Sequence, residues 1–115
     1  MAKYMYLFRG GDAARAQESP ESMQQHMELW KKWMGQLAQN GTLVDGLPLG
    51  REGKQVESKG KVILDGPFTE GKEIVGGYLI VNAKSLTDAA EISKGCPIFE
   101  HDGKIEVREI MNMEM

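Results

Sequence analysis

The chain has 115 residues, a formal net charge of −3 and one cysteine. Its Lys and Arg residues are scattered, which excludes the basic footprint of a nucleic-acid-binding surface, and no apolar run approaches the roughly 20 residues of a membrane helix. A single thiol cannot close an internal disulfide. We therefore expect one cytoplasmic domain over residues 1–115 with no nucleic-acid or membrane partner, ending in a frayed tail at 111–115.

The first predicted elements are a strand and a helix. Residues 3–9 read as a strand whose two faces are both apolar. Ser19 is a suitable N-cap, Pro20 suits the first helical position, and Asn40-Gly41 is a typical stop signal. Apolar residues between them recur at steps of four and three, which predicts one buried stripe. The stripe consists of Met23, Met27, Trp30, Met34 and Leu37.

The second half of the chain is predicted to be mostly strands with one more helix. The elements in order are an extended segment at 42–50, a polar hairpin excursion at 51–60, short strands at 61–64 and 77–81, a helix between Ser85 and Gly95, and a last strand at 104–110. The strand at 77–81 is again apolar on both faces, and the paired Gly76-Gly77 allows a close approach of backbones.

This order indicates an α+β fold, βαββαβ with a hairpin insertion, whose usual outcome is a ferredoxin-like antiparallel sheet. Two helices cover only one face of such a sheet, yet two of its strands are apolar on both faces. A stable monomer does not leave an apolar patch of that size in water. We therefore expect a second copy to pack sheet against sheet as an isologous homodimer.

The stretch Asp65-Gly66-Pro67-Phe68 follows a strand and precedes a charged loop and the paired glycines. This stretch and its flanks resemble the YCII-related family, also called DGPF-domain proteins. The other matching segments are Lys72-Glu73, Gly76-Gly77-Tyr78, Lys3–Phe8, Ser19-Pro20-Glu21, His26-Met27 and His101–Ile110. The resemblance spans nearly the whole chain and implies a ferredoxin-like fold that pairs into a dimeric α/β barrel.

His26 and Asp65 are the first candidates for chemistry. His26 flanks the helical stripe, where it is either a border residue packed against Trp30 or Trp33, or a general acid or base, since imidazole titrates near neutrality. Asp65 either caps its own turn by accepting backbone N–H groups or orients His26, and both roles are compatible. The family resemblance implies a His–Asp pair with its histidine at this place in the first helix.

His101 is either an exposed turn residue or, as the resemblance implies, part of the site. We take His26, Asp65 and His101 as catalytic candidates. A metal held by these three is the alternative, but their spacing forms no compact ligand motif, so we expect no metal and no cofactor. The negative end of the second helix should raise the pKa of the Cys96 thiol, which makes it a poor nucleophile. The candidate substrate-binding residues are Arg9, Lys72, Glu73 and Tyr78.

Two functions fit these residues. In the first, the protein is an enzyme that does acid–base chemistry on a small carbonyl- or hydroxyl-bearing molecule, with a lyase-, dehydrochlorinase- or isomerase-like reaction that the resemblance alone suggests. In the second, it is a non-catalytic ligand-binding or accessory dimer, because relatives occur beside sigma-factor regulators. An enzyme requires His26 within hydrogen-bond reach of Asp65, directly or through one water.

Overall fold

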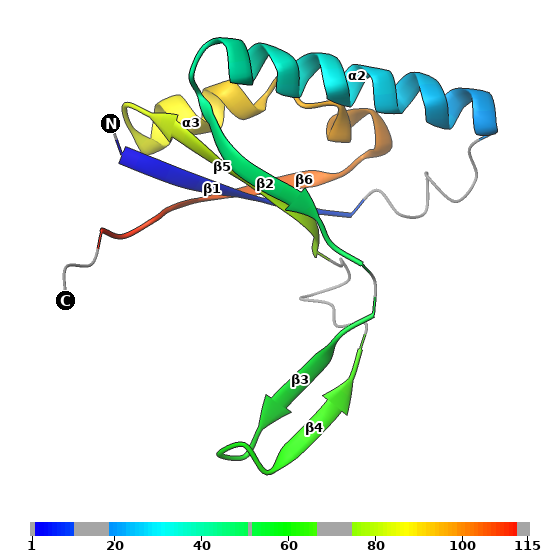
Figure 1. Ribbon diagram of the computed structural model, residues 1–115, viewed down its shortest axis with the longest axis vertical. Helices are drawn as coiled ribbons and strands as arrows, with labels where there is room; N and C mark the ends of the chain where they lie inside the picture. The colour runs from blue at the N-terminus through cyan, green and yellow to red at the C-terminus, as the bar shows by residue number, and fades with distance from the viewer. Residues whose placement is uncertain (1, 11–18, 51, 67–74, 113–115) are drawn as a thin grey trace.

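The protein has an α+β fold in a computed structural model that describes residues 2–10, 19–50, 52–66 and 75–112. The elements in chain order are strand β1 (Ala2–Arg9), helix α2 (Pro20–Gln39), strands β2 (Leu43–Pro48), β3 (Lys54–Glu57), β4 (Val62–Asp65) and β5 (Val75–Ala83), helix α3 (Leu86–Ser93), the 3-10 helix η1 (Pro97–His101) and strand β6 (Lys104–Glu109). Both α-helices lie on the same face of the main sheet (Figure 1).

The main sheet has the strand order β2-β5-β1-β6, and every pair in it is antiparallel. The predicted strands at 3–9, 77–81 and 104–110 and the extended segment at 42–50 all lie in it. The strand predicted at 61–64 does not: it pairs with β3 in a separate two-stranded hairpin. The predicted close approach at Gly77 is confirmed, because a Cβ there would lie only 3.1 Å from the carbonyl oxygen of Leu47.

Both helices begin where their capping residues predict. The Ser19 hydroxyl accepts a hydrogen bond from the backbone N–H of Ser22 at 3.1 Å, and the Ser85 hydroxyl accepts one from Asp88 at 3.0 Å. Each bond satisfies a donor that the first helical turn leaves unpaired. Helix α2 ends at the C-cap Asn40. These caps fix the start of both helices that cover the sheet.

The core lies between the helices and one face of the sheet. Tyr6 is fully buried there, and its hydroxyl donates to the backbone oxygen of Ala89 at 2.5 Å. Burial, reinforced by the nearby Asp88, raises the pKa of Tyr6 to about 12. The Trp33 ring stacks on Tyr6 with ring centroids 6.5 Å apart. This bond and this stack tie α2 and α3 to the central strand.

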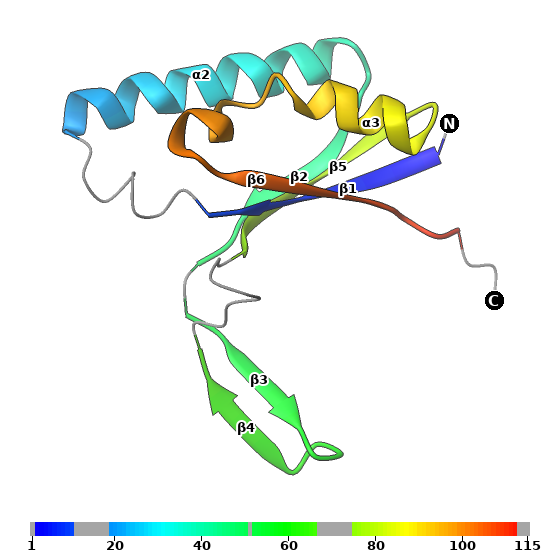
Figure 2. The same ribbon diagram turned by 180° about the vertical axis from the view of Figure 1, so that it is seen from behind.

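The buried side of α2 differs from the predicted stripe in its N-terminal half. Met23 and Met27 are exposed, which makes that half of the prediction wrong. The residues that face the protein recur at steps of four, three and four, and they are His26, Trp30, Trp33 and Leu37. Figure 2 shows the first turns of α2 extending past the end of the sheet, where no strand lies beneath them. Periodicity identifies the apolar side of a helix, but it does not show where the sheet beneath that side ends.

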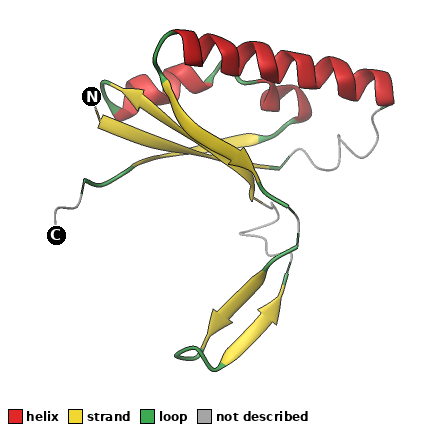
Figure 3. Cartoon of the chain, in the orientation of Figure 1, coloured by secondary structure: helices red, strands yellow, loops and turns green. Residues whose placement is uncertain are grey.

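The other face of the sheet carries no helix in the described part of the chain. Its apolar residues, which we call the open face, are Met5, Leu7, Leu47, Tyr78 and Ile80. We call the β3–β4 hairpin, residues 54–65, the arm. The arm stands clear of the sheet on the open-face side, opposite the helices (Figure 3). The expectation that two strands are apolar on both faces is confirmed.

Candidate functional site

The structure brings His26 and His101 together. His26 comes from α2 and His101 ends η1, and their rings are in contact, with centroids 3.8 Å apart and planes tilted by 30°. Both are largely buried, with 11% of the His26 side chain and 8% of His101 exposed. The two histidines, 75 residues apart in sequence, form one imidazole pair. The interpretation of His101 as an exposed turn residue is therefore wrong, and the alternative, that it is part of the site, stays a prediction.

The local sequence explains where His101 lies. Pro97 starts the 3-10 helix, and Asp102 ends it with a left-handed backbone, φ 58°. The next residue is Gly103, where a Cβ would overlap the Ile98 side chain and approach the backbone oxygen of Arg9 to 3.1 Å. Only glycine fits such a turn without displacing its neighbours. The tight turn returns the chain into β6 and leaves the His101 ring against α2.

Trp30 fixes the protonation pattern of His26. The indole Nε1–H of Trp30, one helical turn on, donates to His26 Nε2 at 2.8 Å. Because an indole nitrogen only donates, Nε2 must accept, and neutral His26 then carries its proton on Nδ1. The structure thus supplies a histidine with a defined tautomer.

Glu100 is the carboxylate beside that proton. One of its oxygens, Oε2, lies 3.4 Å from His26 Nδ1. The contact lacks hydrogen-bond geometry, and the buried Nδ1 has no hydrogen-bond partner among the described residues. The Glu100 side chain is mostly exposed, so the carboxylate reaches solvent while its neighbour is buried. A donor buried without a partner is costly, so Nδ1 is the atom of the pair at which a new hydrogen bond would be most favourable.

Asp65 does not reach this site within one chain. It is the last residue of β4, and its Oδ1 accepts a hydrogen bond from Lys54 Nζ at 2.5 Å across the arm. Its side chain is 79% exposed, and Figure 1 shows the arm far from α2. Strand pairing with β3 holds Asp65 at the base of the arm. The carboxylate beside His26 is that of Glu100, where Asp65 was predicted. The turn that Asp65 was expected to cap runs into residues 67–74, outside the described residues.

The predicted substrate-binding residues lie elsewhere. Arg9 is on the side of the sheet opposite the helices, where its Nε donates to Glu106 Oε1 at 3.3 Å. Tyr78 is on the open face, opposite Leu7 of the neighbouring strand. The sheet therefore separates both residues from the histidine pair. Lys72 and Glu73 lie outside the described residues.

Two residues of the site, Trp30 and Glu100, were not predicted to belong to it. Trp30 was assigned to the core stripe and named only as a packing neighbour of His26, although its spacing of four places it within reach of that ring. Glu100 is the residue before His101 in sequence. Its approach to His26 depends on the path of η1, for which the sequence holds no strong local signal.

A known protein family matches nearly the whole chain, including all the residues of this site. The family model of the YCII-related domain matches residues 2–114. The chain belongs to the YCII-related family. A search of the curated proteins finds no match for it. The histidine pair, Glu100, the open face and the arm of this YCII-related protein all lie within the matched range.

The described residues of this YCII-related protein give little support for a metal site, a membrane-spanning helix or a reactive cysteine. They contain no group of three or more His, Cys, Asp or Glu side chains placed to hold a metal ion. They also contain no helix long and apolar enough to cross a membrane. Cys96 is buried, and burial raises its pKa to about 12. The predicted direction of that shift is right, but burial is its main cause in place of the predicted helix end.

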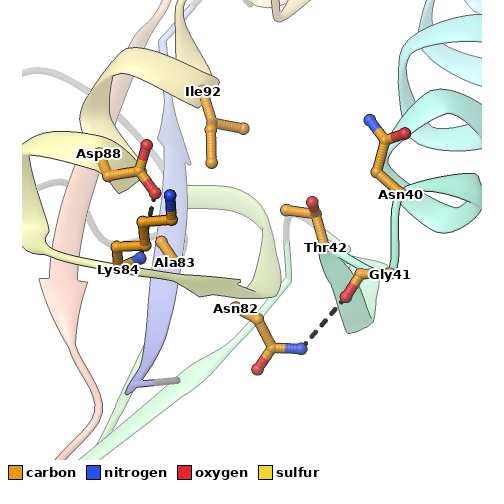
Figure 4. Close-up of a pocket in the computed structure, with 8 residues that line it drawn as sticks. All are labelled: Asn40, Gly41, Thr42, Asn82, Ala83, Lys84, Asp88 and Ile92. Atoms are coloured by element: carbon orange, nitrogen blue, oxygen red, sulfur yellow. Dashed lines mark hydrogen bonds between the residues drawn. The ribbon is translucent and has the colours of Figure 1, made fainter.

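A hollow of about 350 Å³ lies at the other end of α2 (Figure 4). Asn40, Thr42, Asn82 and Lys84 contribute polar groups to its wall. Asn40 follows His26 by 14 positions, which is about 20 Å along a helix. None of the predicted site residues that the structure describes lines this hollow, so it is separate from the histidine pair.

Proposed function

We propose that this YCII-related protein is a homodimer that binds a small molecule and does acid–base chemistry on it at the histidine pair. The observation that carries the proposal is the His26–His101 ring contact, with Glu100 beside a buried nitrogen that has no hydrogen-bond partner among the described residues. Imidazole and carboxylate groups are the side chains that most often serve as general acids and bases, and two imidazoles and one carboxylate meet here. Titratable groups gathered in this way are typical of acid–base sites.

Each residue then has a distinct role. His26 donates through Nδ1–H to an oxygen of the substrate, with Nε2 held by Trp30. Glu100, more exposed, accepts a proton from the substrate's carbon or hydroxyl group. His101 packs against the His26 ring and helps to hold it in place. The reaction class is proton transfer on a small carbonyl- or hydroxyl-bearing molecule, as in a lyase-, dehydrochlorinase- or isomerase-like step.

The proposal includes a ferredoxin-like fold that pairs through the open face into a dimeric α/β barrel. The apolar open face supports it, because burying that face is favourable and the helices cover only the other one. Arg9, Tyr78, Lys72 and Glu73 remain candidates for ligand contact in such a dimer. Asp65 remains a catalytic candidate only if a second subunit supplies it.

A second function, a non-catalytic ligand-binding or accessory dimer, is favoured by one specific observation. Trp30 occupies His26 Nε2, the nitrogen that an imidazole base would otherwise expose. If that bond is purely structural, the histidine pair fixes η1 to α2 and transfers no proton.

Hydrogen–deuterium exchange on small substrates separates the two functions. The protein is incubated in D₂O with pyruvate, lactate or dihydroxyacetone, and loss of the C–H signal is followed by NMR. The proposal expects exchange by the wild type, its loss in His26→Gln and Glu100→Gln, and its retention in Glu91→Gln, a surface carboxylate paired with Lys94. Saturable binding without exchange would favour the accessory function, and neither binding nor exchange would refute the proposed ligand class.

A further inference from the structure

The arm has no packing partner in the described part of the chain. Strands β3 and β4 pair with each other and form no ladder with the main sheet. At its base the Gly66 N–H donates to the Gly53 oxygen at 2.6 Å. An isolated two-stranded hairpin is marginally stable in water at best. Such a hairpin becomes more stable when one of its faces packs against another apolar surface.

One face of the arm is suited to such packing. Val56 and Ile63 lie directly opposite each other, and they are 59% and 62% exposed. Side chains alternate along a strand, so this pair shares its face with the Lys54–Asp65 ion pair. The resulting surface is an apolar centre with a polar edge, which is the usual composition of an interface.

The open face presents a matching surface on the same side of the molecule. Leu7 lies opposite Tyr78, and Met5 lies opposite Ile80, so their side chains form two adjacent apolar rows. Leu47 extends the first row, since it pairs with Tyr78. Figures 1 and 2 both show the arm projecting on this side, away from the helices.

The surface of the chain is too large for an isolated globule of its size. Its accessible area is 8480 Å², whereas a compact monomer of 12.8 kDa has about 6,300 Å². Its radius of gyration is 15.9 Å, against about 13 Å expected for this length. The arm, which stands clear of the sheet, contributes to this excess.

We propose that the arm is an exchanged element: each copy of the chain packs the Val56–Ile63 face of its arm onto the open face of a second copy. The proposal rests on the homodimer proposed above and deepens it. A second copy is the occupant that the structure favours, because the arm and the open face lie on the same side of one chain. In a dimer with a two-fold axis, one association therefore buries both the arm and the open face of each copy.

The first test is the dimer dissociation constant of the full-length chain, measured by sedimentation velocity. Val56→Ser combined with Ile63→Ser should weaken the dimer at least about tenfold, because two branched aliphatic side chains lose their burial. The matched control is Leu64→Ser, an apolar residue on the other face of the same arm, which should leave the constant within about twofold. Equal weakening by both variants would overturn the assignment of the packing face.

The second test is cross-linking between two differently labelled chains. A chain with Ile63→Cys is mixed with a chain with Met5→Cys and treated with a short bis-maleimide, while the native Cys96 is buried. The proposal expects a covalent heterodimer, and no such product when Glu28→Cys on the exposed side of α2 replaces Met5→Cys. If both cysteines in one chain cross-link internally at the mass of one chain, the arm folds onto its own sheet and the proposal is refuted.

The outcomes separate this proposal from the proposed function. A wild type that sediments as a single chain refutes the homodimer and arm exchange together. A dimer that resists the Val56/Ile63 double variant and gives no Ile63–Met5 cross-link keeps the homodimer and refutes arm exchange. Far-UV circular dichroism of each variant confirms that a change in mass comes from the interface, since the substituted arm residues are exposed in one chain.

Discussion

Replacing Trp30 with Phe is the sharpest perturbation of the histidine pair, because it removes one N–H donor and keeps an aromatic ring. The Trp30 ring packs edge-on against Phe8 with ring centroids 5.2 Å apart, and its N–H donates to His26 Nε2 at 2.8 Å. The net loss of one neutral hydrogen bond costs about 0.5–1.5 kcal/mol. With the packing lost from a smaller ring, we expect unfolding free energy to fall by about 1–3 kcal/mol.

Two measurements check this expectation. Urea denaturation gives the free energy of unfolding, and the ¹⁵N shifts of the imidazole nitrogens report which one carries the proton. In the wild type His26 should be the Nδ1–H tautomer, and Trp30→Phe should give a mixture, because nothing then requires Nε2 to accept. The control is Trp33→Phe, which shortens a ring stacked on Tyr6 and should lower stability while leaving the tautomer unchanged. An unchanged His26 spectrum in Trp30→Phe would refute the reasoning.

Two further predictions concern stability. Gly103→Ala should lower the free energy of unfolding, measured in urea, by about 1–3 kcal/mol, because its Cβ would overlap Ile98. Gly35→Ala, at an exposed helical position with nothing within 4 Å, should instead raise the free energy of unfolding by about 0.5–1 kcal/mol. Equal effects of the two variants would contradict the contact between Gly103 and Ile98. Stability should also fall as pH rises above about 9, because burial raises the pKa of Cys96 from 9.0 to about 12 and that of Tyr6 from 10.0 to about 12. The folded state then holds more protons than the unfolded state up to about pH 12, so the slope is negative, at most about 1.4 kcal/mol per pH unit for each group. Cys96→Ala should flatten the slope between about pH 9 and 10, and a slope identical to the wild type would show that the thiol is not responsible.

The sequence predicts most of the fold because the signals for it are local. Ser19 and Ser85 begin the helices at which they serve as caps. The alternating apolar residues of residues 3–9 and 77–81 predict strands with two apolar faces, and the structure has them at the centre of the sheet. Capping and alternation depend on neighbours only a few residues apart, so one sequence is enough to read them.

The candidate site could be predicted only in part because it depends on how distant elements meet. His26 and His101 were both named, but the exposed Met27 was placed in the core because periodicity does not show that α2 extends past the sheet. Asp65 was paired with His26 because nothing in the sequence shows that β4 leaves the main sheet for the arm. The contact of Glu100 with His26 depends on how η1 packs against α2, which is a tertiary feature.

The central claim is that a second copy of the chain covers the open face. Light scattering of the wild-type protein at about 10 μM, a concentration at which interfaces of standard size are usually occupied, tests it most directly. The account predicts a molar mass twice the 12.8 kDa of one chain, and a mass equal to one chain would contradict it.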